Sequence, residues 1–227
     1  MNNNEIKIAL FDLDGTLVST HLWLGIVKHH LKTKENVLPV LWYIFSHMVL
    51  MPFWKMKFIS SEKYYQSWGR DLAELIKGIK VERGKEIFHW LSDEYLMPSL
   101  KKTVFERLEK HRKEGFLTIL TSGSFQELLK IIISHLNMDF AIGTELEVVK
   151  DRFSGKIVPP LCFGEGKVEK IKEFLLEKKL KVNFQDSFAY SDSFFDLPLL
   201  RLVGNPVAVE PDKKLLEIAK VKGWQII

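Results

Sequence analysis

The sequence predicts an α/β fold: a parallel sheet core with helices on both faces, interrupted by an inserted, all-helical cap. From about residue 100 onward, short apolar runs alternate with amphipathic stretches of helical length. This alternation is typical of a parallel sheet whose strands are joined by right-handed crossovers. Between about residues 19 and 98 the pattern is helical, with little strand signal. The 227 residues suffice for one core domain that carries such an insertion.

The N-terminal half begins with a strand and then becomes helical. The apolar run at 6–11 predicts the first strand, within a segment of about 5–17 that also includes the loop after it. Helices are expected near 20–33, 38–59, 61–77 and 83–96. We therefore expect a core made of residues 1–18 and 99–227, and a cap made of residues 19–98.

The C-terminal half alternates helices and strands. After a helix that ends at Glu114, the pattern predicts, in order, a strand at 116–121, a helix at 125–137, a strand near 139–142, a hairpin of 145–150 and 153–158, a helix at 166–180, a strand at 186–190, a helix at 194–202, a strand at 206–209, a helix at 212–221 and a short strand at 224–227. Ligands of such sheets bind outside the carboxyl ends of the strands, so the residues that follow each strand are the first candidates for function.

Charge and cysteine content restrict the function classes. The net charge is +4 and the isoelectric point is near 8.9. This mild basic excess suits an anionic substrate and is too weak to indicate nucleic acid as a partner. Cys162 is the only cysteine, so we expect no internal disulfide and a reducing compartment, the cytoplasm. Residues 1–5 are polar with no secretory signal after them, and no His or Cys spacing indicates a zinc site.

The first strand is followed directly by Asp12, Leu13 and Asp14. In an extended segment alternate side chains point the same way, so Asp12 and Asp14 can face one cavity. Two like charges at that distance are costly unless a metal ion or a proton offsets them. Gly15 and Thr16 then turn the chain out of the strand. The alternative is an ordinary Asp-Gly surface turn.

Two further segments carry polar groups, one after a strand and one at the start of a helix. The strand at 116–121 leads into Ser122 and Gly123, whose hydroxyl and backbone N–H suit an anion at the N-terminus of the next helix. The alternative there is a serine N-cap. Lys167 lies in the first turn of the helix at 166–180, where the macrodipole disfavours a cation, so we expect it to meet an anion. Lys170 lies on the same face and is the second candidate for that role.

The strand at 186–190 precedes the fourth polar segment. Asp192 and Asp196 are spaced to lie on one side of a helical turn. An Asp N-cap with an unrelated surface Asp would have the same spacing. Together the four segments supply a nucleophilic carboxylate, donors for an oxyanion, a cation and metal-binding carboxylates, which suits phosphoryl transfer.

This ordered set of motifs resembles that of the haloacid dehalogenase-like (HAD) hydrolase superfamily, and in particular its phosphoserine phosphatase-like branch, subfamily IB. The resemblance covers nearly the whole chain and rests on the four polar segments together with the stretches 144–147, 153–155, 164–168 and 196–200. It implies a Rossmann-like core with a C1-type helical cap. Such a cap excludes bulk water and selects the leaving group, while the core handles the phosphoryl group.

By this resemblance the protein is a phosphomonoester hydrolase that acts on a small organic phosphate through an aspartyl-phosphate. Asp12 is the expected nucleophile. Asp14 is expected to protonate the leaving oxygen and then to take a proton from the attacking water. Ser122 and the Gly123 N–H would hold phosphoryl oxygens, and Lys167 would neutralise the nucleophile and the transferring group.

The resemblance also implies Mg²⁺ as the cofactor. The ion is expected between Asp12, the backbone carbonyl of Asp14 and Asp192, because hard oxygen ligands suit magnesium. Asp196 would orient metal-bound water from behind these ligands. Haloacid dehalogenases lack a carboxylate at the position of Asp14, so dehalogenation is disfavoured. A non-catalytic binding module is disfavoured because all of the expected catalytic residues, Asp12, Asp14, Lys167 and Asp192, are present. Transfer of the phosphoryl group to an acceptor other than water stays open.

Four positions depart from phosphoserine phosphatase. His21 stands where that enzyme has a Glu that meets the substrate amino group, and an imidazole would do this poorly. Ser124 replaces a Gly, while Ser193 and Phe195 replace a Gly and an Asn. The phosphatase chemistry survives these changes, but they argue against phosphoserine as the substrate. His21 is therefore our candidate cap residue for substrate specificity.

The cap also contains a very apolar segment at 37–54. We expect a buried central cap helix, since the stretch between Pro39 and Pro52 would span only about 20 Å and a bilayer core needs about 30 Å. The alternative is a surface that meets lipid, because lysines flank the segment at 28, 32, 34, 55 and 57. The protein would then be a lipid-phosphate phosphatase, for a lysophospholipid or a phosphatidylglycerophosphate-like substrate, with peripheral membrane contact through the cap.

Overall fold

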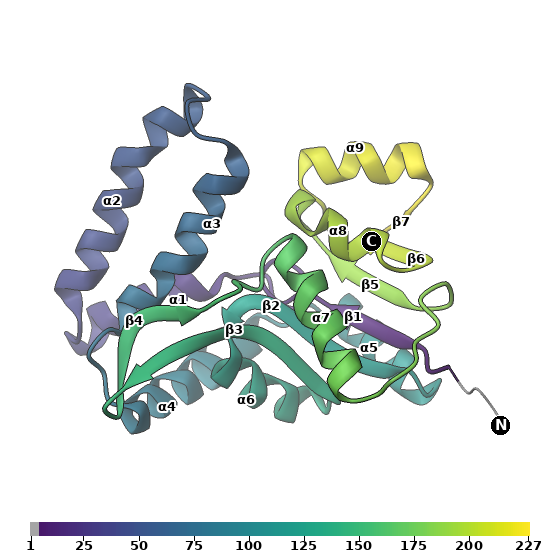
Figure 1. Cartoon of the computed structure of the whole chain (residues 1–227), viewed down its shortest axis with the longest axis horizontal. Coiled ribbons are helices and arrows are strands. Elements are labelled where there is room, and N and C mark those ends of the chain that lie inside the picture. The colour runs from purple at the N-terminus through teal and green to yellow at the C-terminus, as the bar shows by residue number, and fades with distance from the viewer. Residues whose placement is uncertain (1–4) are drawn as a thin grey trace.

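The computed structural model describes residues 5–227, so the first four residues of the expected core segment lie outside the described range. Its centre is a seven-stranded sheet in the order β4-β3-β2-β1-β5-β6-β7 (Figure 1). The strands are β1 (Ile8–Phe11), β2 (Leu117–Phe125), β3 (Phe140–Val149), β4 (Arg152–Val158), β5 (Phe188–Ser191), β6 (Asn205–Ala208) and β7 (Gln225–Ile226). All neighbours are parallel except β3 and β4. The predicted α/β class is confirmed.

Helices cover both faces of the sheet because successive strand residues point to opposite sides. The helices of the C-terminal half are α5 (Lys102–Lys113), α6 (Gln126–Leu136), α7 (Glu165–Glu177), α8 (Leu197–Arg201) and α9 (Lys213–Lys222). From β1, Ile8 and Leu10 pack into the cluster that includes α7, α8 and α9. Ala9 and Phe11 face the other cluster, which includes α5 and α6. A strand that is apolar at every position is what a sheet covered on both faces requires.

Residues 19–98 form helices that fall into two groups. They are α1 (Leu22–Thr33), α2 (Val37–Lys55), α3 (Ser61–Asp71), η1 (Leu72–Ile76), α4 (Val81–Trp90), η2 (Leu91–Leu96) and η3 (Met97–Ser99). The α2–α3 pair, residues 37–71, stands away from the sheet (Figure 1), and we call it the cap hairpin. By contrast, α4 packs against α6, and the Phe88 ring there contacts those of Phe125 and Phe153.

The expectation of a buried central helix at 37–54 is wrong. Helix α2 continues through Pro52, one turn before its end, and its 19 residues span about 28 Å. It buries Val40, Tyr43 and His47, but only 17% of its most apolar 18-residue window is buried. In the described chain it is the one helix long and apolar enough to cross a membrane. The sequence could not reveal this exposure, because the segment is apolar on every side and only tertiary packing decides which side is covered.

Smaller differences concern the ends of elements. The helix expected at 61–77 becomes the 3₁₀-helix η1 after Asp71, and the helix expected at 83–96 becomes the π-helix η2. The strands expected at 139–142 and 145–150 are one continuous strand, β3. Strand β2 extends beyond residue 121 to Phe125, with a shift of register against β3. The extension delays the start of α6 and changes the surroundings of the predicted phosphate-binding residues.

Candidate active site

The residues that the sequence singles out gather at the carboxyl ends of three adjacent strands, β2, β1 and β5. Asp12 follows β1, Ser122 and Gly123 lie near the end of β2, and Asp192 follows β5. The strand order reverses at β1, since the chain leaves it for β2 on one side and later adds β5 on the other. Open α/β sheets bind their ligands at such a position.

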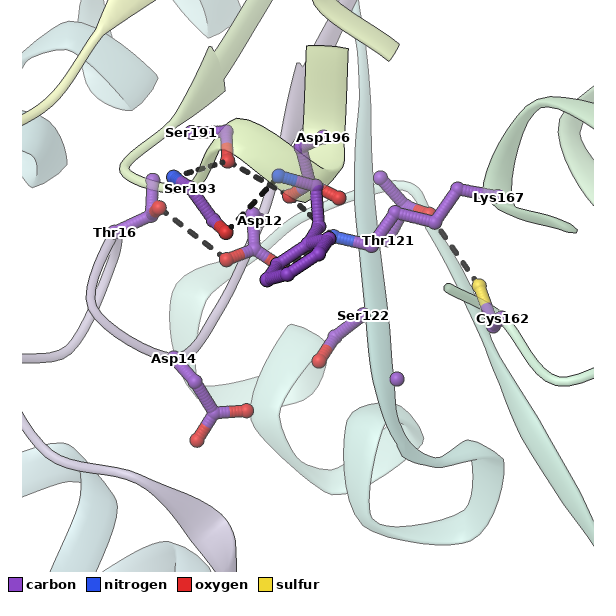
Figure 2. A network of polar contacts seen from close by, with 12 residues as sticks. Asp12, Asp14, Thr16, Thr121, Ser122, Cys162, Lys167, Ser191, Ser193 and Asp196 are labelled. Carbon is purple, nitrogen blue, oxygen red and sulfur yellow. Dashed lines mark hydrogen bonds and ion pairs between the residues drawn. The ribbon is translucent and has the colours of Figure 1, made fainter. Parts of the chain in front are cut away.

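Lys167 lies at the centre of this site and is only 3% exposed. Its Nζ donates to Asp12 Oδ1 and to Asp196 Oδ2, each at 2.6 Å (Figure 2). Burial alone would lower the pKa of Lys167, but the two carboxylates raise it, so the side chain stays an ammonium. Lys170 Nζ instead lies 3.6 Å from Glu145 Oε1. Of the two lysines, Lys167 is therefore the one in contact with the predicted nucleophile.

Asp196 is fixed behind this ion pair. Its Oδ2 accepts hydrogen bonds from Lys167 and from Ser191 Oγ, the latter at 2.7 Å. A buried carboxylate with these partners holds the ammonium against Asp12. The role that the resemblance implied for Asp196, orienting a metal-bound water, stays a prediction.

The loop after β1 connects Asp12 with Asp192. Thr16 Oγ1 lies 2.9 Å from Asp192 Oδ1 and 3.3 Å from Asp12 Oδ2, and it accepts the backbone N–H of Asp192 at 3.0 Å. Gly15 permits this approach, because its φ is +78° and a Cβ there would lie 2.3 Å from Asp192 Oδ2. A side chain at position 15 would push Asp192 away from Asp12.

Asp14 is held separately, on the side of the site that faces the cap. Its Oδ1 accepts the backbone N–H of Leu22 at 2.6 Å, and its Oδ2 accepts Ser124 Oγ at 2.9 Å. Ser124, which departs from the family pattern, thus orients this carboxyl. Burial raises the pKa of Asp14, against the opposing effect of the Leu22 hydrogen bond. A carboxyl that keeps its proton to higher pH suits a general acid.

The charge balance of the site calls for a further cation. Burial raises the pKa of Asp12 well above its ordinary value; the Lys167 charge opposes this rise, and Asp196 and Asp192 add to it. Burial also raises the pKa of Asp192. Hard oxygen donors with surplus negative charge fit a small divalent cation such as Mg²⁺. Asp12 and Asp192, both of which Thr16 Oγ1 contacts, are the carboxylates that would hold it.

Ser122 and Gly123 line the same cavity, but not at a helix N-terminus as we expected. Because β2 continues to Phe125 and α6 starts at Gln126, both residues lie in extended backbone. Ser122 Oγ accepts the N–H of Ser124 at 3.1 Å. Among the contacts of the described residues this hydroxyl only accepts, so its proton stays available to an anion in the cavity.

The site opens into a cavity of about 600 Å³ that reaches from the sheet end to the cap hairpin. The cap hairpin contributes an apolar and aromatic wall made of Tyr43, Met51, Trp54, Tyr64, Tyr65 and Trp68. From the core, the Phe195 ring contacts those of Tyr65 and Phe163. His21 also lines the cavity, at the exposed start of α1. Phe195, where the resemblance led us to expect an amide, thus extends the aromatic wall.

Sequence reasoning missed several residues that shape the site. Thr16 and Ser191 carry no functional signal in the sequence, because a small hydroxyl after a strand is common and its hydrogen-bond partner is not visible there. Ser124 stands out in the sequence only as a departure from the family pattern. The aromatic side chains of α3 carried no signal beyond composition, because helical spacing does not show which face meets a cavity.

Comparison with known proteins identifies the family. A family model described as haloacid dehalogenase-like hydrolase matches residues 9–201. Phosphoserine phosphatase SerB1 of Mycobacterium tuberculosis is 30% identical over 224 residues, which cover 96% of this chain and 69% of that protein. Histidinol-phosphatase of Neisseria meningitidis serogroup C is 28% identical over 242 residues, with 97% of this chain and 98% of that protein covered.

A solved structure supports the fold. A Bordetella pertussis Tohama I protein of unknown function has a TM-score of 0.84 at 24% identity, and the match covers 99% of both chains. The family model covers most of the chain, including all four polar segments, and confirms the resemblance. The chain therefore belongs to the haloacid dehalogenase-like hydrolases.

Proposed function

We propose that this protein is a Mg²⁺-dependent phosphomonoester hydrolase that works through an aspartyl-phosphate on Asp12. Its family and its relatives named as phosphatases make it a phosphatase. The observation that carries the proposed mechanism is the buried contact of 2.6 Å between Lys167 Nζ and Asp12 Oδ1. It fixes Oδ1 of the carboxylate at the end of β1, and Oδ2, which lies 3.3 Å from Thr16 Oγ1, is the oxygen that we assign to the attack on phosphorus.

Each chemical step is assigned to a side chain of the site. Asp12 attacks phosphorus through Oδ2, because Lys167 occupies Oδ1. The bond between phosphorus and the leaving oxygen breaks, and Asp14 gives that oxygen its proton. Asp14 then takes a proton from the water that attacks the aspartyl-phosphate, which releases phosphate and restores the Asp12 carboxylate. Ser122, the Gly123 N–H and Lys167 bind the phosphoryl oxygens in both steps.

The proposal includes the cofactor and the division of the chain. Asp12, Asp192 and the backbone carbonyl of Asp14 would hold Mg²⁺, which supplies positive charge beside the phosphoryl group. In the described chain, residues 5–18 and 99–227 would form the catalytic core, and residues 19–98 would form the cap that encloses the leaving group. The substrate is a small phosphorylated molecule met on the cytoplasmic side, and nucleic acid is not a partner.

The cavity favours an apolar leaving group over an amino acid. The two relatives are named for phosphoserine and histidinol phosphate, whose amino groups call for a carboxylate. Among the described cavity-lining residues outside the sheet-end cluster, the one carboxylate is Asp212, and it is already engaged. It accepts the N–H groups of Phe194, Lys214 and Leu215. We infer that phosphoserine is a poor substrate.

The proposed nucleophile is tested with p-nitrophenyl phosphate and the variant Asp12→Asn. The amide keeps the shape and removes the nucleophile, so turnover should fall by about 10³-fold or more. The control is Asp151→Asn, an exposed aspartate at the β3–β4 turn, which should keep wild-type turnover. Equal turnover in the two variants would refute the assignment.

The proposed leaving group is tested by comparing kcat/KM for 2-phenylethyl phosphate and for phosphoserine, which are both alkyl phosphates. We expect the phenylethyl ester to be preferred by at least about tenfold, which corresponds to about 1.4 kcal/mol of differential binding in the transition state. A preference for phosphoserine would show that the aromatic wall does not select the leaving group.

A further inference from the structure

One face of α2 carries large apolar side chains that the described chain leaves uncovered. They include Leu38, Leu41, Trp42, Phe45, Met48 and Phe53, which are between 49% and 79% exposed. Leu38, Leu41, Phe45 and Met48 follow one another at intervals of three or four residues, and Trp42 and Phe53 lie beside them on the same side of the helix. Together they form one stripe along the helix, which we call the outer face of α2. The opposite side is buried through Val40, Tyr43 and His47.

The outer face is an interaction surface rather than scattered exposure. It runs along a helix of about 28 Å, and α2 has no Asp, Glu, Lys or Arg before Lys55. Single exposed apolar side chains are normal, but a soluble protein rarely exposes a contiguous stripe of this length unless it binds something.

Both ends of the outer face are basic. Lys34 precedes α2, Lys55 is its last residue and Lys57 follows it, and all three lysines are exposed. Glu35, which follows Lys34, is already paired with Arg83. Between α2 and α3, at the tip of the cap hairpin (Figure 1), Met56 and Phe58 are 66% and 74% exposed. An apolar stripe between lysines matches a bilayer interface with anionic headgroups, where the apolar side chains enter the acyl boundary and the ammonium groups meet phosphate.

Two other occupants fit these observations less well. Because both ends are basic, two copies paired through the outer face would bring lysines beside lysines whichever way the helices run. A helix that crossed the membrane would have to leave α3, to which α2 is tied by three hydrogen bonds among the described residues, one of them from Trp54 Nε1 to Ser61 Oγ at 3.1 Å. Tyr43 Oη donates to the Trp68 carbonyl at 3.3 Å, and Tyr64 Oη donates to the His47 carbonyl at 3.2 Å.

We propose that the cap hairpin lies on an anionic membrane, with the outer face of α2 in the lipid interface, and that the substrate is a single-chain lipid phosphate monoester. The substrate part rests on the proposed phosphatase function. The inner side of α2 lines the cavity through Tyr43, Met51 and Trp54. Only the width of one helix, about 10 Å, therefore separates the interface from the aromatic wall that would receive the acyl chain.

Membrane docking is tested by flotation of the full chain with two kinds of vesicle, phosphatidylcholine alone and phosphatidylcholine with phosphatidylglycerol. We expect the protein to float with the anionic vesicles and the bound fraction to fall between about 0.1 M and about 0.5 M salt, as screening weakens the lysine contacts. Failure to float with anionic vesicles at low salt, or equal binding to both kinds, would overturn the proposal.

Paired variants test the surface itself. The double change Phe45→Ser with Met48→Ser, and separately Lys55→Glu with Lys57→Glu, should each weaken vesicle binding by at least about tenfold. The controls are Leu176→Ser with Val221→Ser, which are 80% and 85% exposed, and Lys220→Glu with Lys222→Glu on α9. These controls should bind vesicles as the wild type does. The lysine pair leaves the apolar face intact, so the test does not depend on how the serine variant folds.

Activity measurements separate the two halves of the proposal. All four variants should hydrolyse p-nitrophenyl phosphate at the wild-type rate, because none of these residues lines the cavity. A single-chain lipid phosphate in anionic vesicles should exceed a short, water-soluble glycerol phosphate in kcat/KM by at least about tenfold, and the two α2 variants should lose this advantage. No hydrolysis of any phosphomonoester would reject the phosphatase function and leave docking standing.

Hydrolysis of p-nitrophenyl phosphate without flotation would reject docking and leave the phosphatase standing. Light scattering adds the last outcome. A dimer that the serine variant converts to monomer, together with no vesicle binding, would show that a second copy occupies the outer face.

Discussion

In the described chain, the side chains at the carboxyl end of the sheet have partners within the protein, whereas those on the outside of the cap hairpin largely lack them. At the sheet end, each of Asp12, Asp14, Asp192 and Asp196 accepts at least one hydrogen bond from the protein. On α2, the outer face is apolar and exposed. Phosphoryl chemistry needs fixed geometry, so the core supplies partners from within. Recognition of an external partner needs an accessible surface, so the outer face of α2 stays exposed.

Removal of the metal should have the largest effect, because it acts on the most charged part of the sheet end. Treatment with EDTA should lower p-nitrophenyl phosphate turnover by about 10³-fold or more, and added Mg²⁺ should restore it. Ca²⁺ should restore it poorly, since it takes a looser and larger shell of ligands. Circular dichroism serves as the control that the protein stays folded. Full turnover in metal-free protein would contradict the cofactor assignment.

The change Asp14→Asn should affect substrates unequally. An amide cannot protonate the leaving oxygen, so hydrolysis of an alkyl phosphate should fall by about 10²-fold to 10⁴-fold. p-Nitrophenolate leaves without needing a proton, so its release in the first turnover should slow much less, whereas the later hydrolysis of the aspartyl-phosphate, for which Asp14 is the proposed base, should slow for both esters. Rapid-mixing kinetics measure the first turnover, and a similar loss there for both esters would mean that Asp14 only orients the loop through Leu22 and Ser124.

The free energy of unfolding should depend very differently on two phenylalanines of the helical insertion, one buried against the core and one exposed on α2. Phe88 is fully buried where α4 meets the core, so Phe88→Ala should lower the free energy of unfolding by about 3–5 kcal/mol. Phe45 on the outer face of α2 is 59% exposed, so Phe45→Ala should change it by less than about 0.5 kcal/mol. Urea unfolding of both variants measures the difference. A large loss for Phe45→Ala would show that the outer face packs within the fold.

Two buried histidines, His30 in α1 and His111 in α5, should make stability depend on pH. Burial lowers the pKa of His30 in α1 and of His111 in α5 to about 4, against about 6.5 in the unfolded chain. Between these values the unfolded state binds protons that the folded state does not. The free energy of unfolding should therefore fall as the pH drops from about 6.5 to about 4, by up to about 1.4 kcal/mol per pH unit for each histidine.

The variant His30→Leu should remove the contribution of the cap histidine and leave that of His111, which contacts Tyr190 Oη at 2.8 Å. Urea unfolding at pH 7 and pH 5 measures the slope, with the exposed His89→Leu as the matched control. Identical slopes in the two variants would show that His30 is protonated in the folded chain.

Much of the fold could be predicted because its signals are local. Strand β5 lies within two residues of its expected range at either end, and the apolar run before Asp12 is the buried strand β1. The local sequence pattern predicted the wrong boundary where a strand continued further than its own apolar run. Strand β2 continues through Ser122, Gly123 and Ser124 because pairing with β3 resumes at Phe125, and that pairing is not local.

The candidate site divides in the same way. The sequence could name Asp12, Asp14, Asp192 and the two lysines, because each follows a strand or opens a helix. It could not choose between Lys167 and Lys170, since the choice depends on Asp12, 155 positions away. The sequence also could not show that Asp196 contacts the ammonium of Lys167. Nor could it show that Thr16 lies between the carboxylates of Asp12 and Asp192.

The sequence by itself determined the α/β class, the membership of a phosphatase-bearing family and the residues at the strand ends, because periodicity and motif spacing are properties of neighbouring residues. Only the tertiary structure decided which side chains touch and which side of α2 is covered. The physical reason is that a hydrogen bond or a buried face needs a partner from a distant segment. A segment that is apolar all round shows its exposed side only when the rest of the chain has packed.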